Sequence, residues 1–531
     1  MDNELVYRRR WLILAVLSVS VFLVVVDNTI VNVALPTLNS ELDASVSELQ
    51  WIVDAYSLVF AGLLLAAGGF GDRVGRKGAM QVGLVIFGVM SALAAFASSS
   101  GQLIAARGAM GIGAALVFPA TLAILTNVFT EPAERAKAIG AWSAVSGLAV
   151  AVGPVTGGFL LEHFWWGSVF FVNVPIVVFA LVAGWLIIPS SKDPDSGRFD
   201  VLGTLLSIGG VGLLVFTVIE GPRWGWGSTS TMLGFAGSAL LLVGFVLWEL
   251  RVTHPLLDVR VFKIARFSAA AGAISVSSFA MFGFVFLATQ YFQFVLGYST
   301  LSAGLHTAPF AVFVGVTAPL GARLALTYGP RRVVSSGLGL MSLGLVIASQ
   351  LTADSAYVGP VLISMAVIAI GLSLVFAPAT EAVMGALPKE KAGAGAAVND
   401  TTRELGGTLG VAVIGSVFAS VYGPQVVDAL RQFPVPADAV EAARESMGAA
   451  LQITAAAPDG VRESLQGVAS GAFIDGMSVG YLVAAGVALA GAVVTAIFLP
   501  GRAHAEAAAA ERAAAAEVAG VSGIEPAIEP A

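Results

Sequence analysis

Long apolar runs follow one another along most of the chain, with short polar loops between them. A helix that crosses a membrane needs about 20 mostly apolar residues, and fourteen segments reach that length. The first eight cover residues 11–38, 49–70, 79–98, 102–126, 136–161, 169–189, 200–220 and 231–250. The other six cover residues 267–294, 302–327, 333–350, 357–378, 393–421 and 472–499. The pattern predicts an all-α polytopic membrane protein with fourteen transmembrane helices.

Basic residues gather in every second loop. Lys or Arg precedes the first span and follows spans 2, 4, 6, 8, 10 and 12, whereas alternate loops such as SSSGQ and LGYSTLSAG contain neither. Because short basic loops stay on the cytoplasmic side, we expect both termini on the cytoplasmic side of a bacterial-type plasma membrane. The Ala-rich loop 422–471 carries arginines on the other side, but long loops weigh little in this rule. We expect a short amphipathic helix in that loop.

Composition narrows the class of protein further. Hydrophobic residues make up 57% of the chain and charged residues 11%, which is far from the roughly 25% charged content of a soluble domain. The chain has no Cys, which excludes disulfides and thiolate metal sites, and its four His lack metal-ligand spacing. No GxxxxGK[ST] loop indicates use of ATP. We therefore expect no cofactor, no metal, no nucleic-acid partner and no enzyme activity.

An internal repeat divides the chain. GIGAALVFPAT (111–121) returns as AIGLSLVFAPAT (369–380), and GGFGDRVGRK (68–77) returns as GARLALTYGPRR (321–332). The offsets indicate two copies of six helices with two helices inserted between them, a design found in transporters. We expect an N-terminal bundle over 1–190, a linker pair over 191–266, a C-terminal bundle over 267–500 and a cytoplasmic tail over 501–531.

Five motifs resemble those of the major facilitator superfamily, and more narrowly the 14-helix branch of drug:proton antiporters. They are DNTIVNVALP (27–36), GGFGDRVGRK (68–77), RGAMGIG (107–113), GPVTGG (153–158) and FFVNVP (170–175). The resemblance implies two six-helix bundles plus two extra helices, and a proton-coupled exporter of amphipathic or cationic drugs that confers antibiotic resistance. Two departures limit what carries over: Met110 stands where Gln is frequent, and Leu326 stands where a second copy of Asp72 would fall.

Asp27 is the first candidate for proton coupling. It lies about 13 Å inside the end of the first span marked by Pro36. A carboxylate at the bilayer centre costs roughly 2.5–3.5 kcal/mol, so it indicates a functional site unless it only hydrogen-bonds neighbouring helices. Arg107 lies at a similar depth and is the expected counter-charge. Asp54 completes the expected polar cluster, with a solvated acid of the outer vestibule as the alternative.

Two glycine-containing motifs are candidate moving parts. The resemblance implies an inner gate in the loop after span 2, where the alternative is a plain positive-inside anchor. The gating candidates are Gly68, Asp72, Arg73, Gly75, Arg76 and Lys77. The span-5 motif is associated with export, and it predicts a flexible helix that seals one face of the cavity or else ordinary small-residue packing. Its members are Gly147, Gly153, Pro154, Gly157 and Gly158.

A substrate site for lipophilic cations should combine aromatic faces, amides and a carboxylate. The candidates are Asp27, Asn28, Tyr56, Trp142, Phe286, Gln290, Tyr291 and Phe294. The alternative for each aromatic residue is simple packing. On span 13, Asp400 and Arg403 have the spacing of a pair on one helix face, which we interpret as local structure.

Other functions remain open on the sequence alone. The same fold could serve a dedicated natural-product, peptide or lipid exporter, or a proton-coupled importer. A receptor or an intramembrane enzyme has little support, because no nucleophile or metal constellation is present. The expected partners are a small-molecule substrate, protons and the lipid bilayer, and the expected unit is a monomer.

Overall fold

The structure is a computed structural model that describes residues 3–191, 200–253, 255, 257–384, 386, 392–433, 435–456 and 459–500. These residues form helices and short connections, with no strand among them. Twelve described helical segments are long and apolar enough to cross a membrane. Helices α2 and α5, with 29 and 32 residues, pack among them and bring the number to the predicted fourteen.

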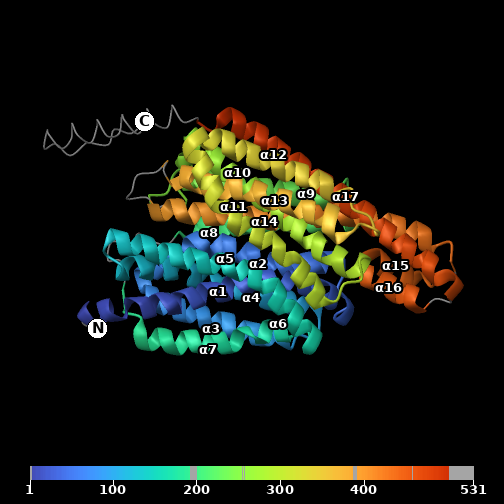
Figure 1. Cartoon of the computed structure of the whole chain (residues 1–531), viewed down its shortest axis with the longest axis horizontal. Helices are drawn as coiled ribbons and strands as arrows, with labels where there is room; N and C mark the ends of the chain where they lie inside the picture. The colour runs from blue at the N-terminus through green and yellow to red at the C-terminus, as the bar shows by residue number, and fades with distance from the viewer. Residues whose placement is uncertain are drawn as a thin grey trace.

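The helices of the first half begin at the blue end of the chain in Figure 1. They are α1 (Asn3–Glu41), α2 (Val46–Val74), α3 (Arg76–Ala95), α4 (Ser100–Val128), α5 (Pro132–His163), α6 (Ser168–Phe171) and α7 (Asn173–Ile187). The linker helices are α8 (Val201–Trp224) and α9 (Thr229–Glu249), followed by a 3-10 turn η1 (Val259–Lys263). Helices α6 and α7 together form the sixth span.

The second half forms the yellow to red layer of Figure 1. It contains α10 (Ala265–Gln290), the π turn η2 (Tyr291–Val295), α11 (Thr300–Tyr328), α12 (Pro330–Ala348), the π turn η3 (Tyr357–Val361), α13 (Leu362–Met384) and α14 (Ala392–Leu430). It continues with α15 (Ala437–Glu445), α16 (Met447–Ala456) and α17 (Asp459–Phe498). The domain boundaries drawn from the sequence stay a prediction.

The two copies of the repeat share local geometry. Gly75 joins α2 to α3 with φ of 127°, and Gly329 joins α11 to α12 with φ of 84°, a backbone conformation that favours glycine. A Cβ at Gly83 would lie 2.7 Å from the carbonyl oxygen of Gly113, and a Cβ at Gly337 would lie 2.7 Å from that of Gly371. Close helix packing through glycine therefore recurs at matching places in the two bundles.

The bundles meet along two seams. Helix α5 packs on α11, and α2 packs on α14, while α8 contacts both α2 and α14. The arginine end, where α1 begins, is at the left of Figure 1, and the far end, where α15 and α16 project, is at the right. The side chain of Gln50 joins the bundles near the far end, because its Nε2 donates to the carbonyl oxygen of Ala412 at 2.9 Å.

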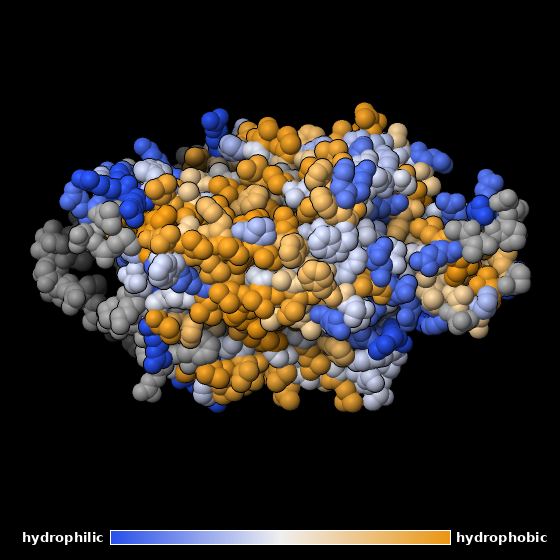
Figure 2. Space-filling view, turned by 90° about the horizontal axis from the view of Figure 1, so that it is seen from below, coloured by the Kyte–Doolittle hydropathy of each residue, from blue (hydrophilic) through white to orange (hydrophobic). Residues whose placement is uncertain are grey.

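The surface agrees with a membrane location. Figure 2 shows hydrophobic residues over the middle of one face, with hydrophilic residues gathered toward its two ends. Large apolar side chains such as Leu240 on α9 and Val316 on α11 are 74% and 73% exposed in the isolated chain. A bilayer would cover such side chains, since lipid and not water surrounds the middle of a membrane protein.

The predicted loop 422–471 differs from the structure. Helix α14 continues to Leu430 and α17 already begins at Asp459, so the connection is shorter than predicted. It holds two short helices, α15 and α16, rather than one. Polar residues are compatible with helix here, because α15 and α16 project at one end of the molecule, where solvent accepts charged side chains (Figure 1).

Candidate functional site

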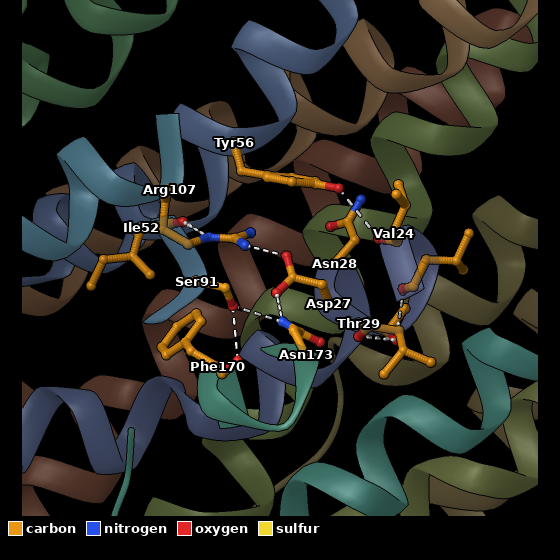
Figure 3. Close-up of polar contacts among 12 residues, drawn as sticks. Val24, Asp27, Asn28, Thr29, Ile52, Tyr56, Ser91, Arg107, Phe170 and Asn173 are labelled. Atoms are coloured by element: carbon orange, nitrogen blue, oxygen red, sulfur yellow. Dashed lines mark hydrogen bonds and ion pairs between the residues drawn. The ribbon is translucent and has the colours of Figure 1, made fainter. Parts of the chain in front are cut away.

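Asp27 and Arg107 form an ion pair in the interior of the first bundle. Arg107 Nη1 donates to Asp27 Oδ2 at 2.5 Å, and both side chains are 0% exposed. The Nδ2 group of Asn173 donates to the other carboxylate oxygen, Oδ1, at 2.8 Å. Figure 3 shows the carboxylate between the two donors. Helices α1, α4 and α7 thus converge on one buried carboxylate.

Further contacts hold the two donors in place. The Nε group of Arg107 donates to the carbonyl oxygen of Ile52 at 3.0 Å, and its Cζ atom lies 4.2 Å from the ring centroid of Tyr56. Asn173 Nδ2 also donates to Ser91 Oγ at 3.0 Å, and Ser91 Oγ donates to the carbonyl oxygen of Phe170 at 2.8 Å. The ion pair is therefore held in place by hydrogen bonds to acceptors on α2, α3 and α6 (Figure 3).

Three polar atoms beside the ion pair are unused. Within the described residues, Arg107 Nη2, Asn28 Oδ1 and Asn173 Oδ1 are buried without a hydrogen-bond partner. A buried polar group without a partner costs about 1–3 kcal/mol, and most such groups in proteins have one. One donor and two acceptors beside Asp27 are consequently available to water or to a polar group of a bound molecule.

Asp54 does not join this cluster as predicted. Its side chain is 0% exposed, and neither carboxylate oxygen has a hydrogen-bond partner within the described residues. It lies one turn after Gln50, so it shares the face of α2 that Gln50 turns to α14. The depth of Asp54 was predicted from helical rise, but the hydrogen bonds of Arg107 go to Asp27 and to the carbonyl oxygen of Ile52, and not to Asp54.

A second charged cluster lies on α14, where the sequence indicated only local structure. Arg403 Nη2 lies 3.1 Å from Glu404 Oε1, and Arg403 Nη1 lies 3.6 Å from Asp400 Oδ1. Glu404 is buried, and its contact with Arg403 adds a second acid to the pair that the sequence indicated. The spacing of one Arg between two acids on a membrane helix was the available signal. The cluster carries one more acid than base and belongs to the second bundle.

The predicted aromatic substrate residues are mostly packed in the core. Phe286 is 0% exposed, Gln290 Nε2 donates to the carbonyl oxygen of Phe286, and Tyr291 Oη donates to that of Thr352. Trp142 Nε1 donates to Thr121 Oγ1 at 3.3 Å, and Phe294 is partly buried. Their predicted role in binding substrate stays a prediction.

An apolar groove lies between α1 and α5 near the arginine end. Its volume is about 440 Å³. Trp11, Phe22 and Val145 are among its lining residues. Phe22 precedes Asp27 by five residues, which corresponds to about 7.5 Å along α1. The groove therefore offers apolar surface between the arginine end and the level of the ion pair.

The predicted gate loop is tied to its own bundle. Lys77 Nζ donates to the carbonyl oxygen of Trp185, and the backbone N–H of Arg76 donates to that of Ser191. Gly68 lies against Pro119 of α4, and Arg73 is exposed. The side chain of Asp72 lies outside the described part of the chain. The predicted gating role of this loop stays a prediction.

The span-5 motif packs α5 between two neighbours. A Cβ at Gly157 would lie 2.7 Å from Ile30 Cγ1 on α1, and Gly153 faces Thr29. A Cβ at Gly158 would lie 2.6 Å from the Cα atom of Leu301 on α11. The carbonyl of Pro154 faces Gly304, whereas the surroundings of Gly147 lie outside the described part. The motif thus forms the seam between the bundles as well as packing on α1.

Solved structures share this architecture. A bacterial homologue of the human lysosomal transporter Spinster matches with a TM-score of 0.61, at 17% identity, over 92% of this chain and 97% of that one. The xylose transporter XylE from E. coli matches with a TM-score of 0.56, at 13% identity, over 93% and 97%. These likenesses concern the fold.

Relatives of known name cover nearly the full chain. The multidrug efflux pump LfrA of Mycolicibacterium smegmatis is 35% identical over 92% of this chain and 96% of its own length. The tetracenomycin C resistance and export protein of Streptomyces glaucescens is 34% identical over 92% and 91%. The methyl viologen resistance protein SmvA of Salmonella typhimurium is 34% identical over 88% and 93%.

A family model matches most of the chain. The model of the Major Facilitator Superfamily matches residues 17–411, which include the ion pair, the gate loop and the span-5 motif. The fold, the two copies of the six-helix unit and the relatives agree with this match. The chain belongs to the Major Facilitator Superfamily, a family of membrane transporters.

Proposed function

We propose that the chain exports amphipathic or cationic compounds in exchange for protons. The observation that supports this most is the buried ion pair between Asp27 and Arg107. Holding two charges away from water carries a desolvation cost, and ionisable residues inside membranes mark ion and substrate paths. Fully buried charges that served only packing could be replaced by apolar residues at little loss.

The geometry supports exchange at one carboxylate. A proton on Asp27 removes the negative charge that Arg107 Nη1 faces, which leaves Arg107 without its counter-charge and favours a rearrangement of α1 against α4. A cationic substrate would compete with that proton for the same oxygen atoms. Because the carboxylate cannot hold both, release of the proton and binding of the substrate become coupled. The unused atoms of Asn28 and Asn173 supply acceptors for the substrate.

The proposed direction of transport depends on which end of the molecule faces the cytoplasm and which end is closed. We propose that the arginine end faces the cytoplasm, as the positive-inside rule predicts. The α1–α5 groove begins there, while Gln50 and Gly158 hold the bundles together near the far end. Substrate would thus reach Asp27 from the cytoplasm, and opening of the far end would release it. Impermeant maleimide should label Thr352→Cys but not Arg332→Cys on whole cells.

Proteoliposomes with an internal pH dye test the exchange. Methyl viologen is a suitable first substrate, because SmvA is named for resistance to it and because it is a permanent dication. Wild type should move protons when methyl viologen is added, and Asp27→Asn should not. Asp354→Asn, which removes an exposed acid, is the control that should behave like wild type. Equal proton movement in Asp27→Asn and wild type would contradict the assignment of Asp27.

A dedicated natural-product exporter is the second candidate function. The tetracenomycin C export protein matches this chain almost as well as LfrA, at 34% against 35% identity over the same share of the chain. Flux of an aromatic polyketide but of no cation would favour this reading. Substrate uptake toward the cytoplasm would favour the importer.

The proposed oligomeric state is a monomer, and measuring the molecular size of the purified protein tests it.

A further inference from the structure

Asn39 lies buried near the end of α1, and every polar atom of its amide is used. Its Nδ2 group donates to Ser446 Oγ at 2.8 Å and to the carbonyl oxygen of Ala44 at 2.5 Å. Its Oδ1 atom accepts from the backbone N–H of Gly448 at 2.8 Å and from Ser446 Oγ at 3.1 Å. An Asn side chain has two donors and one acceptor oxygen, so the site satisfies all of them.

The partners of Asn39 form the start of α16. Ser446 precedes α16, and its Oγ atom accepts from the backbone N–H of Ala449, which is the contact of a helix cap. The N–H of Gly448 is one of the first-turn donors that a helix leaves without an internal partner. Asn39 supplies that partner. A side chain at position 448 would collide with Asn39 Oδ1, so this contact requires glycine.

Helices α15 and α16 otherwise belong to the second bundle. They connect α14 to α17 in the chain and pack on both. Tyr422 Oη on α14 donates to the carbonyl oxygen of Ala443 at 3.1 Å, and both residues are buried. The ring of Phe418 stacks on that of Tyr422 at 5.2 Å between centroids and meets Phe473 of α17 at 5.0 Å. Asn39 therefore connects the first bundle to a projection of the second.

We infer that Asn39 is a gating residue that keeps the far end closed through the α15–α16 pair. The inference rests on the proposed transport function, in which the far end opens to release substrate. When the bundles separate at this end, α15 and α16 stay with α14 and α17, because they are the chain segment between these two helices and pack on them, α15 on α14 and α16 on α17. The Asn39 hydrogen bonds are then the ones that break. Asn39 and Ser446 thereby set how often the far end opens.

The absence of Cys from the chain makes a cross-linking experiment clean. In Asn39→Cys/Ser446→Cys, oxidation should reduce substrate-driven proton flux at least tenfold, and reduction should restore it. The matched controls are the single variants Asn39→Cys and Ser446→Cys, in which no cross-link can form within the chain and flux should not respond to oxidation or reduction. Full flux in completely cross-linked Asn39→Cys/Ser446→Cys, checked by mass, would overturn the inference.

A distance measurement tests the inference without any transport assay. Spin labels on Phe164→Cys and Asp354→Cys, both exposed, report the separation of the bundles at the far end. Gly448→Ala should raise the ratio of open to closed protein about fivefold, since one lost hydrogen bond changes an equilibrium by roughly that factor. Ser446→Ala, which removes both hydrogen bonds between Ser446 and Asn39, should raise it at least as much. An unchanged distribution in both variants would overturn the gating role. If wild type shows the expected distribution of spin-label distances but moves no protons when substrate is added, the result would count against the proposed function and not against the gating role.

Discussion

Arg107 Nη1 lies 2.5 Å from Asp27 Oδ2, and neither side chain is exposed to solvent. The two residues come from α4 and α1, so the ion pair joins two helices of one bundle. Breaking a buried pair by removing one partner is more damaging than replacing both, because the remaining charge is left without compensation. This asymmetry separates the structural contribution of the pair from its role in transport.

Neutralising one partner should destabilise the protein more than neutralising both. Asp27→Asn should lower the free energy of unfolding by about 3–5 kcal/mol, because Arg107 loses its counter-charge. Asp27→Asn/Arg107→Gln should recover most of that loss. Thermal unfolding in detergent and proton flux in proteoliposomes are measured on the same preparations. Recovery of flux together with stability in the double variant would show that the pair is structural only.

Asp54 should respond in the opposite way. Its carboxylate is buried and has no hydrogen-bond partner within the described residues. The substitution Asp54→Asn therefore replaces a buried acid, which is costly, without leaving any partner unpaired. We expect an unfolding temperature equal to or above that of wild type. If Asp54 also carries protons, the same variant loses flux while it gains stability. A clear loss of stability would mean that the carboxylate has a partner in the folded protein.

The difference between these two acids shows which features of the site can be predicted from the sequence and which cannot. Helical rise placed Asp27, Asp54 and Arg107 at similar depths, and that depth is visible in the sequence alone. Which acid meets Arg107 depends on how α1, α2 and α4 pack against one another, and α2 also contacts α14 through Gln50. That contact joins residues 362 positions apart. No local pattern predicts it.

The sequence analysis also did not identify two polar residues whose contacts depend on the packing of distant helices. Asn173 lies in the FFVNVP motif, yet its hydrogen bond to Asp27 comes from the packing of α7 against α1. Asn39 lies near the end of a helix and has ordinary neighbours in the sequence, while its partner Ser446 is 407 positions away. The repeat, the number of spans and the motifs were predictable because each depends on composition or on local spacing.

Gly158 provides a test of the seam between the bundles. A Cβ there would meet the backbone of Leu301 at 2.6 Å, and backbone atoms cannot move aside as a flexible side chain can. Gly158→Ala should weaken the closed far end by about 1–3 kcal/mol, the usual range for overpacking. The control is Gly486→Ala on α17, where a Cβ would meet no atom within 4 Å. Spin labels at positions 164 and 354 should report more open protein only in Gly158→Ala.

Glu134 gives a prediction about pH at the arginine end. Arg10 binds it through two hydrogen bonds, from Nε to Oε2 and from Nη2 to Oε1, both 2.9 Å long. The hydrogen bonds from Arg10 lower the pKa of the Glu134 carboxyl below its usual value, and nearby Lys137 adds to the effect. Because the pKa is lower in the folded protein than in the unfolded chain, the contact stabilises the protein above the unfolded pKa.

That stabilisation should disappear as the pH falls through the lowered pKa of Glu134. Between neutral pH and the acid range, wild type should therefore lose more thermal stability than Glu134→Gln, whose amide does not titrate. Unfolding temperatures of both proteins in detergent across this range measure the difference. Asp354→Asn, which removes an exposed acid elsewhere, should keep the wild-type slope. Parallel slopes for wild type and Glu134→Gln would mean that Arg10 does not hold Glu134 in solution, and that the α1–α5 contact at the arginine end depends on apolar packing alone.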